Sequence, residues 1–249
     1  MYQKERLDKI LSIVRHYGYV TVKYLVAELH YSNATVNRDL NCLEAQKLVH
    51  RTYGGVEAVE KKGVPIRFRY HKMKSAKLKI AKKAAELIKD GEIIFIDAST
   101  TAEYMLEFLT QKKNIKVLTN NVSLVMRLSE AGISVVCLGG DVVESPCMLD
   151  GEDTVLAAMR YRAQKAFFST GFFTKDGKIG SAPTYHLLHT VMVNNSMQSY
   201  FLADHEKLDA INDQDKFLFD FSKLSGVISD YEFDEEIKRK YPNTDFYKV

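Results

Sequence analysis

The chain has 249 residues, 46% of them hydrophobic and 27% charged, which is typical of a folded globular protein. Its net charge of +3 conceals a division, because the first 83 residues contain 18 Lys and Arg against 7 Asp and Glu, and the remainder 17 against 25. The sequence lacks a membrane-length apolar stretch, a signal peptide and a C-x-x-C pair, so we expect a cytoplasmic protein without a membrane partner, a disulfide framework or a metal site. A basic first part joined to an acidic remainder predicts that the first part meets a polyanion.

Residues 1–58 have the pattern of a winged helix-turn-helix domain. Apolar residues at helical spacing predict a first helix that ends near Gly18. Thr21 is placed to cap a second, short helix, and Ser32 to cap a third after a tight turn. The next segment predicts two short strands around the glycine pair at 54–55, which would form the wing.

The outward face of the third helix carries side chains that suit the major groove of duplex DNA. An Asn side chain can pair with adenine and an Arg side chain with guanine, while hydroxyl groups can meet phosphate. We therefore expect a double-stranded DNA partner. The predicted DNA-binding residues of this helix and the wing are Ser32, Asn33, Thr35, Asn37, Arg38, Arg51 and Thr52.

An alternative is that the same unit serves protein contacts. In that case Asn33 and Thr35 are merely solvated, and Arg38 forms a surface ion pair with Asp39 that contributes little. The basic charge of the unit favours DNA.

Residues 59–75 are expected to be a basic linker, in which Gly63 to Pro65 interrupts regular structure. From about Ser75 apolar residues at helical spacing predict a helix. Its lysines can extend outward, either to the DNA backbone or simply to solvent. They are Lys77, Lys79, Lys82 and Lys83.

Residues 76–249 alternate apolar runs with helical patterns, which predicts an α/β domain with a mostly parallel sheet. The run Ile93–Ile96 is uniformly apolar, as in a buried parallel strand. Small polar residues follow this strand and several later ones, and the carboxyl ends of such strands are where ligands bind.

Together these strand ends suit a polyhydroxy ligand that carries a phosphate. Hydroxyl groups and free helix N–H groups can cradle the phosphate, while carboxylates and amides can accept or donate to sugar hydroxyls. Any single position is equally well explained by an ordinary turn, so the prediction depends on the repetition. The predicted effector-binding residues are Asp97, Ser99, Thr100, Thr101, Thr119, Asn120, Asn121, Gly139, Gly140, Thr170, Gly171, Asp204 and Lys207.

The stretch YSNATVNRDLNCLEAQKLVHRTYGGV resembles the DNA-binding signature of the DeoR family of bacterial transcription regulators. The family pattern is roughly S-x-x-T-[IV]-R-R-D-L-x-x-L, followed by G-x-[LIV]-x-R-x-x-G-G. Asn37 departs from it, because the family usually has Arg there. With one positive charge fewer, we expect DNA affinity to depend less on salt.

The resemblance covers nearly the whole chain, since IDASTT, LTNN, LGG, LDG, FFSTGFF and DHEK look like counterparts of motifs in the family's C-terminal sensor domain. That domain is similar in fold to ribose-5-phosphate isomerase and glucosamine-6-phosphate deaminase. The resemblance implies a phosphorylated sugar as effector and no cofactor. Since DNA-binding units of this kind act in pairs, we expect a homodimer or a higher homo-oligomer.

Three departures from the family pattern point to a changed or missing effector. Ala98-Ser99 replaces the usual Ser-Gly, and Phe172 and Phe173 add bulk beside the preceding glycine. Further on, His186 and His189 occupy a segment that lacks the family's Glu and Lys. These histidines are interpreted either as a pH-sensitive contact or as satisfied surface or core residues.

We therefore expect a sequence-specific DNA-binding transcription regulator and not an enzyme. It would repress a carbohydrate-metabolism operon, with its DNA binding modulated by a phosphorylated sugar. One alternative is a sugar-phosphate isomerase or deaminase with an appended DNA-binding domain, for which Asp97, Asp204 and Lys207 are the acid–base candidates. A second is an interaction module whose C-terminal domain has lost its ligand.

Overall fold

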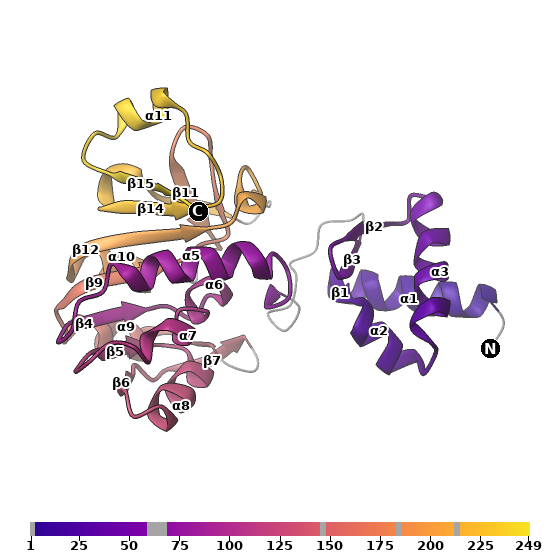
Figure 1. Ribbon diagram of the computed structural model, residues 1–249, viewed down its shortest axis with the longest axis horizontal. Coiled ribbons are helices and arrows are strands. Elements are labelled where there is room, and N and C mark those ends of the chain that lie inside the picture. Colours follow the sequence, from indigo (N-terminus) through magenta and orange to yellow (C-terminus); the bar gives the residue numbers. More distant parts are fainter. Residues whose placement is uncertain (1–2, 59–68, 145–147, 183–185, 212–214) are drawn as a thin grey trace. The chain divides into compact units, whose positions relative to one another are not determined.

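The computed structural model describes residues 3–58, 69–144, 148–182, 186–211 and 215–249. It divides into two compact units, residues 1–74 and 75–249, called here the N-terminal and C-terminal units (Figure 1). Most of the predicted linker at 59–75, including Gly63 to Pro65, lies outside the described residues. Within the described ranges no helix has the length and apolar character needed to cross a membrane.

The N-terminal unit is a winged helix-turn-helix, and the predicted caps set its helix boundaries. The Thr21 hydroxyl accepts from the backbone N–H of Tyr24 at 3.1 Å, and the Ser32 hydroxyl from that of Thr35 at 3.2 Å. His30 ends the second helix in the left-handed region, at φ 57°. The elements are α1 (Gln3–Tyr17), β1 (Tyr19–Thr21), α2 (Val22–Leu29), α3 (Asn33–Ala45), β2 (Val49–Thr52) and β3 (Gly55–Ala58).

The wing contains a third strand that the sequence analysis missed. β3 pairs antiparallel with both β2 and β1, so that Val56 lies opposite Arg51 on one side and Val20 on the other. A Cβ at Gly55 would lie 2.3 Å from the Tyr19 hydroxyl oxygen, so this position needs glycine. The extra strand, β1, thus connects the wing to the helices. The core of this unit includes Ile10, Val14, Leu25, Val36 and Leu40.

The C-terminal unit is built on a seven-stranded sheet of order β15-β14-β12-β9-β4-β5-β6, in which every pairing is parallel. The predicted fold class is therefore confirmed. The strands are β4 (Ile93–Ile96), β5 (Lys116–Thr119), β6 (Ser134–Cys137), β9 (Ala163–Phe168), β12 (Ser196–Ala203), β14 (Gly226–Ser229) and β15 (Asp245–Lys248).

Helices cover both faces of this sheet, which explains why β4 is apolar throughout (Figure 1). Ile94 and Ile96 point into a core formed with α5, α6, α7 and α8, whereas Phe95 points into the core on the other side, with α9 and α10. The helices are α5 (Lys74–Glu86), α6 (Thr100–Glu103), α7 (Leu106–Leu109), α8 (Val122–Glu130), α9 (Glu152–Met159), α10 (His186–Asn194) and α11 (Glu235–Lys240).

Two smaller sheets complete this unit. One is a hairpin of β7 (Asp141–Glu144) and β8 (Met148–Asp150), and the other joins β10 (Phe172–Phe173), β11 (Lys178–Ser181) and β13 (Lys216–Asp220). The rings of Phe172 and Phe173 are buried, and Phe173 packs edge-on to Phe201 with ring centroids 6.2 Å apart. Of the bulk that the sequence analysis placed beside Gly171, Phe173 is therefore directed into the aromatic core, whereas Phe172 packs against Phe217 of β13 with ring centroids 5.6 Å apart.

Candidate nucleic-acid and effector sites

The predicted DNA-reading side chains lie at the N-terminal end of α3, where the Ser32 cap starts the helix. Ser32, Asn33 and Arg38 are exposed, and Thr35 and Asn37 are half-buried. The hydroxyls of Ser32 and Thr35 are 2.9 Å apart, so they form a local pair at the helix start. This end of α3 thus presents hydroxyl, amide and guanidinium groups to solvent.

Asp39 does not form the surface ion pair with Arg38 that the alternative interpretation required. Its carboxylate is fully buried and accepts two hydrogen bonds from Arg6 of α1, one of them from Nη2 to Oδ1 at 3.0 Å. This hydrogen-bonded pair is the main cause of a raised pKa for Arg6, whose guanidinium also lies 5.0 Å from the centre of the Tyr31 ring. The pair ties α3 to α1 and leaves Arg38 exposed, without an ionic partner among the described residues.

The wing arginine lies against α3. The backbone N–H of Arg51 donates to Glu44 at 3.0 Å, and its guanidinium donates to the amide oxygens of Asn37, at 2.5 Å, and Asn41. The Asn37 amide in turn donates to the backbone oxygen of Asn33 at 2.9 Å. Asn37 and Arg51, which the sequence analysis treated as separate contacts, therefore form one hydrogen-bonded group.

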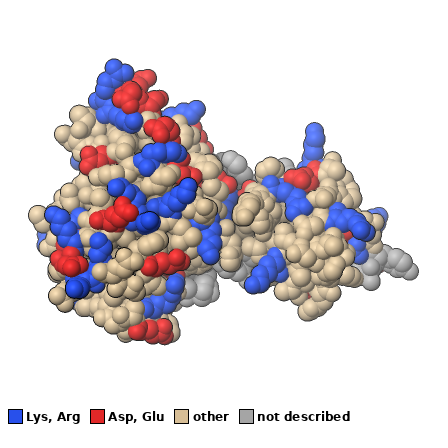
Figure 2. All heavy atoms as spheres, viewed as in Figure 1, with Lys and Arg blue, Asp and Glu red and all other residues tan. Residues whose placement is uncertain are grey.

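Thr52 and its neighbour occupy the end of the wing. Thr52 is half-buried, and its hydroxyl has no hydrogen-bond partner among the residues that the structure describes. Tyr53, at the turn between β2 and β3, is fully exposed, and sequence reasoning overlooked it because an aromatic residue beside two glycines carries no periodic signal. Figure 2 shows more Lys and Arg than Asp and Glu over this unit, whereas the two charge types alternate over the C-terminal unit.

Asp97 is the centre of a network at the carboxyl end of β4. It accepts from the Ser99 hydroxyl at 2.6 Å and from the backbone N–H of Ser169 at 3.2 Å. Its Oδ2 is also 3.2 Å from Nε2 of His189. With three partners from three elements, this buried carboxylate holds the strand ends together.

The hydroxyl group predicted after β4 lies beside a lysine that the sequence analysis placed in solvent. Ser99 caps α6 by accepting from the backbone N–H of Ala102 at 3.2 Å. The Thr100 hydroxyl accepts from Nζ of Lys77, only 4% of which is exposed, at 3.0 Å. Lys77 is therefore turned inward from α5 to this edge of the sheet, which corrects the prediction that it extends outward.

Of the three polar residues at the end of β5, Thr119 and Asn121 are engaged in local hydrogen bonds, whereas Asn120 keeps one acceptor atom without a partner among the described residues. Asn121 caps α8 through its Oδ1, which accepts from the backbone N–H of Leu124 at 3.0 Å, and its amide donates to Glu103 at 2.6 Å. The Thr119 hydroxyl accepts from the backbone N–H of Asn121 at 3.1 Å. Asn120 donates to the backbone oxygen of Leu149 at 2.7 Å and keeps its own Oδ1 unused among the described residues.

The glycine pair after β6 has a packing role. Gly139 and Gly140 have φ values of 74° and 107°, in the region that favours glycine. A Cβ at Gly140 would lie 2.0 Å from the Thr154 hydroxyl and 2.6 Å from the backbone oxygen of Asp150. The pair therefore brings the β6 loop against β8 and α9, and the ordinary-turn interpretation accounts for it.

Lys207 reaches the carboxyl end of β9. Its Nζ donates to the Ser169 hydroxyl at 2.6 Å and to the backbone oxygen of Thr170 at 2.7 Å. Asp204 is buried at the end of β12, and Gly171 is exposed beside β11. The chain thus places a second lysine at the same sheet edge as Lys77.

His189, whose role the sequence left open, also lies at this edge of the sheet. It is 6% exposed, packs 5.2 Å from the Phe168 ring and meets Asp97 through Nε2. Its Nδ1 is buried without a partner among the described residues. His186, on the same helix, instead meets the backbone oxygen of Ser181 at 3.0 Å.

Unsatisfied polar atoms gather at this edge. Among the described residues of the C-terminal unit, four buried side-chain polar atoms have no partner: Thr101 Oγ1, Asn120 Oδ1, His189 Nδ1 and Ser196 Oγ. The first three belong to residues at or against the carboxyl ends of β4 and β5, and only Ser196 lies at the opposite end of the sheet. Because each such atom costs about 1–3 kcal/mol, the cluster indicates a site for a polar ligand or water.

Metal ligands do not assemble in the part of the chain that the structure describes. There, no three His, Cys, Asp or Glu side chains come together in an arrangement that could hold a metal ion. What the edge offers is two lysines, several hydroxyls and a set of hydrogen-bond acceptors.

Two family models match the chain. Residues 72–231 match the DeoR C terminal sensor domain, and residues 6–62 match the DeoR-like helix-turn-helix domain.

Similar proteins are named as transcription regulators. The "Lactose phosphotransferase system repressor" of Lactococcus lactis subsp. lactis is 34% identical over 218 residues, which is 84% of each chain. The "Uncharacterized HTH-type transcriptional regulator FruR" of Bacillus subtilis is 31% identical over 91% of this chain and 88% of its own. The lactose phosphotransferase system repressor of Staphylococcus aureus is 28% identical over 96% of both.

Among solved structures, ribose 5-phosphate isomerase A from Methanocaldococcus jannaschii is similar over 54% of both chains, with 18% identity and a TM-score of 0.40. The likeness thus spans about half of that enzyme. The translation factor subunit eIF2B delta from Chaetomium thermophilum is similar over 68% of this chain and 59% of its own, with 20% identity and a TM-score of 0.48.

Proposed function

The chain belongs to the DeoR family of transcription regulators, and on that premise we propose that it represses a carbohydrate-metabolism operon and is tuned by a phosphorylated sugar. It is a DNA-binding regulator in which the N-terminal unit reads the operator. The C-terminal unit binds the effector at the carboxyl edge of its sheet. The observation that carries the effector half of this proposal is the cluster of unsatisfied polar atoms at that edge.

DNA reading is assigned to α3 and the wing. Arg38 is exposed on α3 because Asp39, its neighbour, is paired with Arg6 inside the unit. A free guanidinium on a recognition helix suits a guanine edge or a phosphate. Ser32, Asn33 and Thr35 start the same helix and are assigned to the DNA backbone and adjacent bases, and Asn37, Arg51 and Thr52 complete the predicted contact set.

Phosphate binding is assigned to the edge where Lys77 and Thr100 meet. A buried ammonium beside hydroxyl groups attracts an anion more strongly than a solvated lysine would, because the surrounding dielectric is lower. The neighbouring strand β9 ends at a second lysine contact, where Nζ of Lys207 meets Ser169 and Thr170. This contact adds further hydrogen-bond donors for a phosphate. Asn121, Gly139 and Gly140 are assigned to the framework, since their groups are used in capping and packing.

Coupling between the two sites is assigned to α5. This helix starts at Lys74, where the N-terminal unit ends, and Lys77 in its first turn contacts Thr100. A phosphate that engages Lys77 or Thr100 changes contacts of the helix that directly follows the linker. Modulation requires that the ligand binds more tightly to one arrangement of the DNA-binding units than to another, and we propose that these units act as a pair in a homo-oligomer.

The test combines effector screening with DNA binding. The full chain is screened with phosphorylated sugars by thermal shift, and any stabilising sugar is then added to a gel shift on the DNA upstream of the chain's own gene. We expect concentration-dependent stabilisation and a changed DNA affinity. Stabilisation without any change in DNA affinity would contradict the regulatory proposal.

An isomerisation assay on the same sugars separates the regulator from the sugar-phosphate isomerase alternative. The Asp97 carboxylate accepts from the Ser99 hydroxyl and the Ser169 backbone and meets His189, so it is engaged in positioning strand ends. We expect no turnover of ribose 5-phosphate. Measurable isomerisation that is lost in Asp97→Asn would favour the enzyme.

A further inference from the structure

One nitrogen of His189 is among the polar atoms at the effector edge that have no partner within the described residues. Nε2 of His189 lies 3.2 Å from a carboxylate oxygen of Asp97, so Nε2 donates to this carboxylate. The other nitrogen, Nδ1, is not used in this contact. That atom is buried and has no partner among the described residues.

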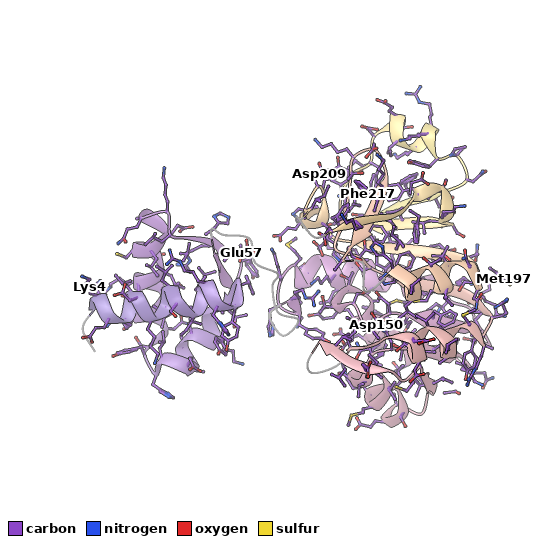
Figure 3. All side chains as sticks on the ribbon, turned by 180° about the vertical axis from the view of Figure 1, so that it is seen from behind. Lys4, Glu57, Asp150, Met197, Asp209 and Phe217 are labelled. Atoms are coloured by element: carbon purple, nitrogen blue, oxygen red, sulfur yellow. The ribbon has the colours of Figure 1, made fainter. Side chains whose placement is uncertain are left out.

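Two further acceptors lie near it. Asn120 donates its amide to the backbone oxygen of Leu149, which fixes the orientation of the amide and leaves Oδ1 as an unused acceptor among the described groups. The next residue, Asp150, ends β8 and is 4% exposed (Figure 3). Leu149, the residue before Asp150, is hydrogen-bonded to Asn120 in both directions. Asn120 follows β5, the neighbour of β4, and the carboxyl end of β4 holds Asp97 and its partner His189.

This acceptor group differs from the phosphate-binding part of the same edge. Lys77, Lys207 and the Thr100 hydroxyl offer donors, which suit phosphate oxygens. Asn120 Oδ1 and the Asp150 carboxylate offer acceptors, which repel a phosphate and attract hydroxyl groups. A hydroxyl group can also pair with His189 Nδ1, since a hydroxyl both donates and accepts. A ligand with a phosphate at one end and hydroxyls at the other matches both parts.

We propose that His189, with Asp150 and Asn120, forms a hydroxyl-binding subsite that recognises the sugar end of the effector, and that His189 contributes its Nδ1 to this subsite. This inference rests on the proposed function, because it assumes that a phosphorylated sugar occupies the edge. Asp97 positions the imidazole and does not contact the ligand. His189 is thus a specificity-determining residue that distinguishes one sugar from another. The phosphate contributes affinity that is the same for every phosphorylated sugar.

Two substitutions separate Nδ1 from the other roles of His189. His189→Gln can keep a donor for Asp97 in place of Nε2 but has no nitrogen at the Nδ1 position. His189→Phe keeps the ring that packs on Phe168 and removes both nitrogens. His186→Gln is the matched control, since His186 lies on the same helix and its ring meets the backbone oxygen of Ser181 instead.

The experiment is calorimetric titration of the full-length protein. The ligands are fructose 1-phosphate, fructose 6-phosphate, galactose 6-phosphate, glucose 6-phosphate and ribose 5-phosphate, with inorganic phosphate as the probe that lacks a sugar. The measured quantity is the ratio of the Kd for inorganic phosphate to the Kd for the tightest sugar phosphate. Thermal unfolding of each variant verifies that it is folded.

We expect His189→Gln and His189→Phe to lower this ratio by about 3- to 10-fold, the loss of one neutral hydrogen bond, without changing the Kd of inorganic phosphate. His186→Gln should leave the ratio unchanged. An unchanged ratio in both folded His189 variants, with sugar phosphate still bound, would overturn the subsite and leave the proposed function standing. Equal weakening of phosphate and sugar phosphate would also overturn it, and binding of no sugar phosphate by the unmodified protein would overturn both proposals.

Discussion

Replacing either member of the ion pair between Arg6 and Asp39 should destabilise the N-terminal unit, and the two losses of stability should differ. The Asp39 side chain is fully buried, whereas 13% of the Arg6 side chain is exposed. Arg6→Ala leaves the Asp39 carboxylate inside the unit without its charged partner, which costs up to about 3–5 kcal/mol. Asp39→Ala removes charged hydrogen bonds worth about 1.5–3 kcal/mol, but the guanidinium left behind can reach solvent.

Hydrogen exchange of the α3 backbone amides measures this difference within the N-terminal unit. We expect both variants to reduce the protection of α3, and Arg6→Ala to reduce it by at least about 1 kcal/mol more than Asp39→Ala. Arg38→Ala is the control, because a change at an exposed site should stay within about 0.5 kcal/mol. If Arg38→Ala lowered protection as much as Arg6→Ala does, Asp39 would be paired with Arg38 and the assignment of Arg38 to DNA would fail.

Other predictions concern DNA, effector, packing and pH. Arg38→Ala should weaken operator binding by about 1–3 kcal/mol if this side chain reads a base, and Arg38→Lys should restore only the charge-dependent part, as measured by fluorescence anisotropy at several salt concentrations. Thr100→Glu should abolish the effector response, because it places a carboxylate beside Lys77 where the phosphate is expected, and should leave DNA affinity unchanged in a gel shift without effector. Gly140→Ala should lower the melting temperature, since its Cβ would clash with the backbone oxygen of Asp150 at 2.6 Å; an unchanged melting temperature would refute the packing role. Burial raises the pKa of Asp150, so its ionisation opposes folding at neutral pH, and Asp150→Asn should stabilise the protein there. This gain should stay constant down to the raised pKa and shrink only as the pH falls further, from the raised pKa toward the ordinary value of a carboxyl group.

Local features of the chain were predictable from the sequence because their causes are local. The caps at Thr21 and Ser32 depend on residues three positions away, and the buried strand Ile93–Ile96 depends on its own composition. The mostly parallel sheet likewise follows from the alternation of apolar runs with helical segments along the chain. The three-residue strand β1 was missed because it is too short to show a period.

The partners of buried charges were not predictable, because they come from distant parts of the chain. Asp39 meets Arg6 across 33 positions, and His189 meets Asp97 across 92. Lys77 was expected in solvent because a lysine on an amphipathic helix usually extends outward, but Thr100, 23 positions later, lies within its reach. Asn121 was predicted to bind the effector from its place after β5, and its part in capping α8 was not foreseen.

The central claim is that the C-terminal unit senses a phosphorylated sugar and thereby changes how the N-terminal unit binds DNA. The most direct measurement is the affinity of the full-length protein for the DNA upstream of its gene, titrated with the sugar phosphate that stabilises it most, beside the same titration of Thr100→Glu. We predict that DNA affinity changes with sugar phosphate in the unmodified protein and stays constant in Thr100→Glu. An affinity that is identical with and without every stabilising sugar phosphate would contradict the account.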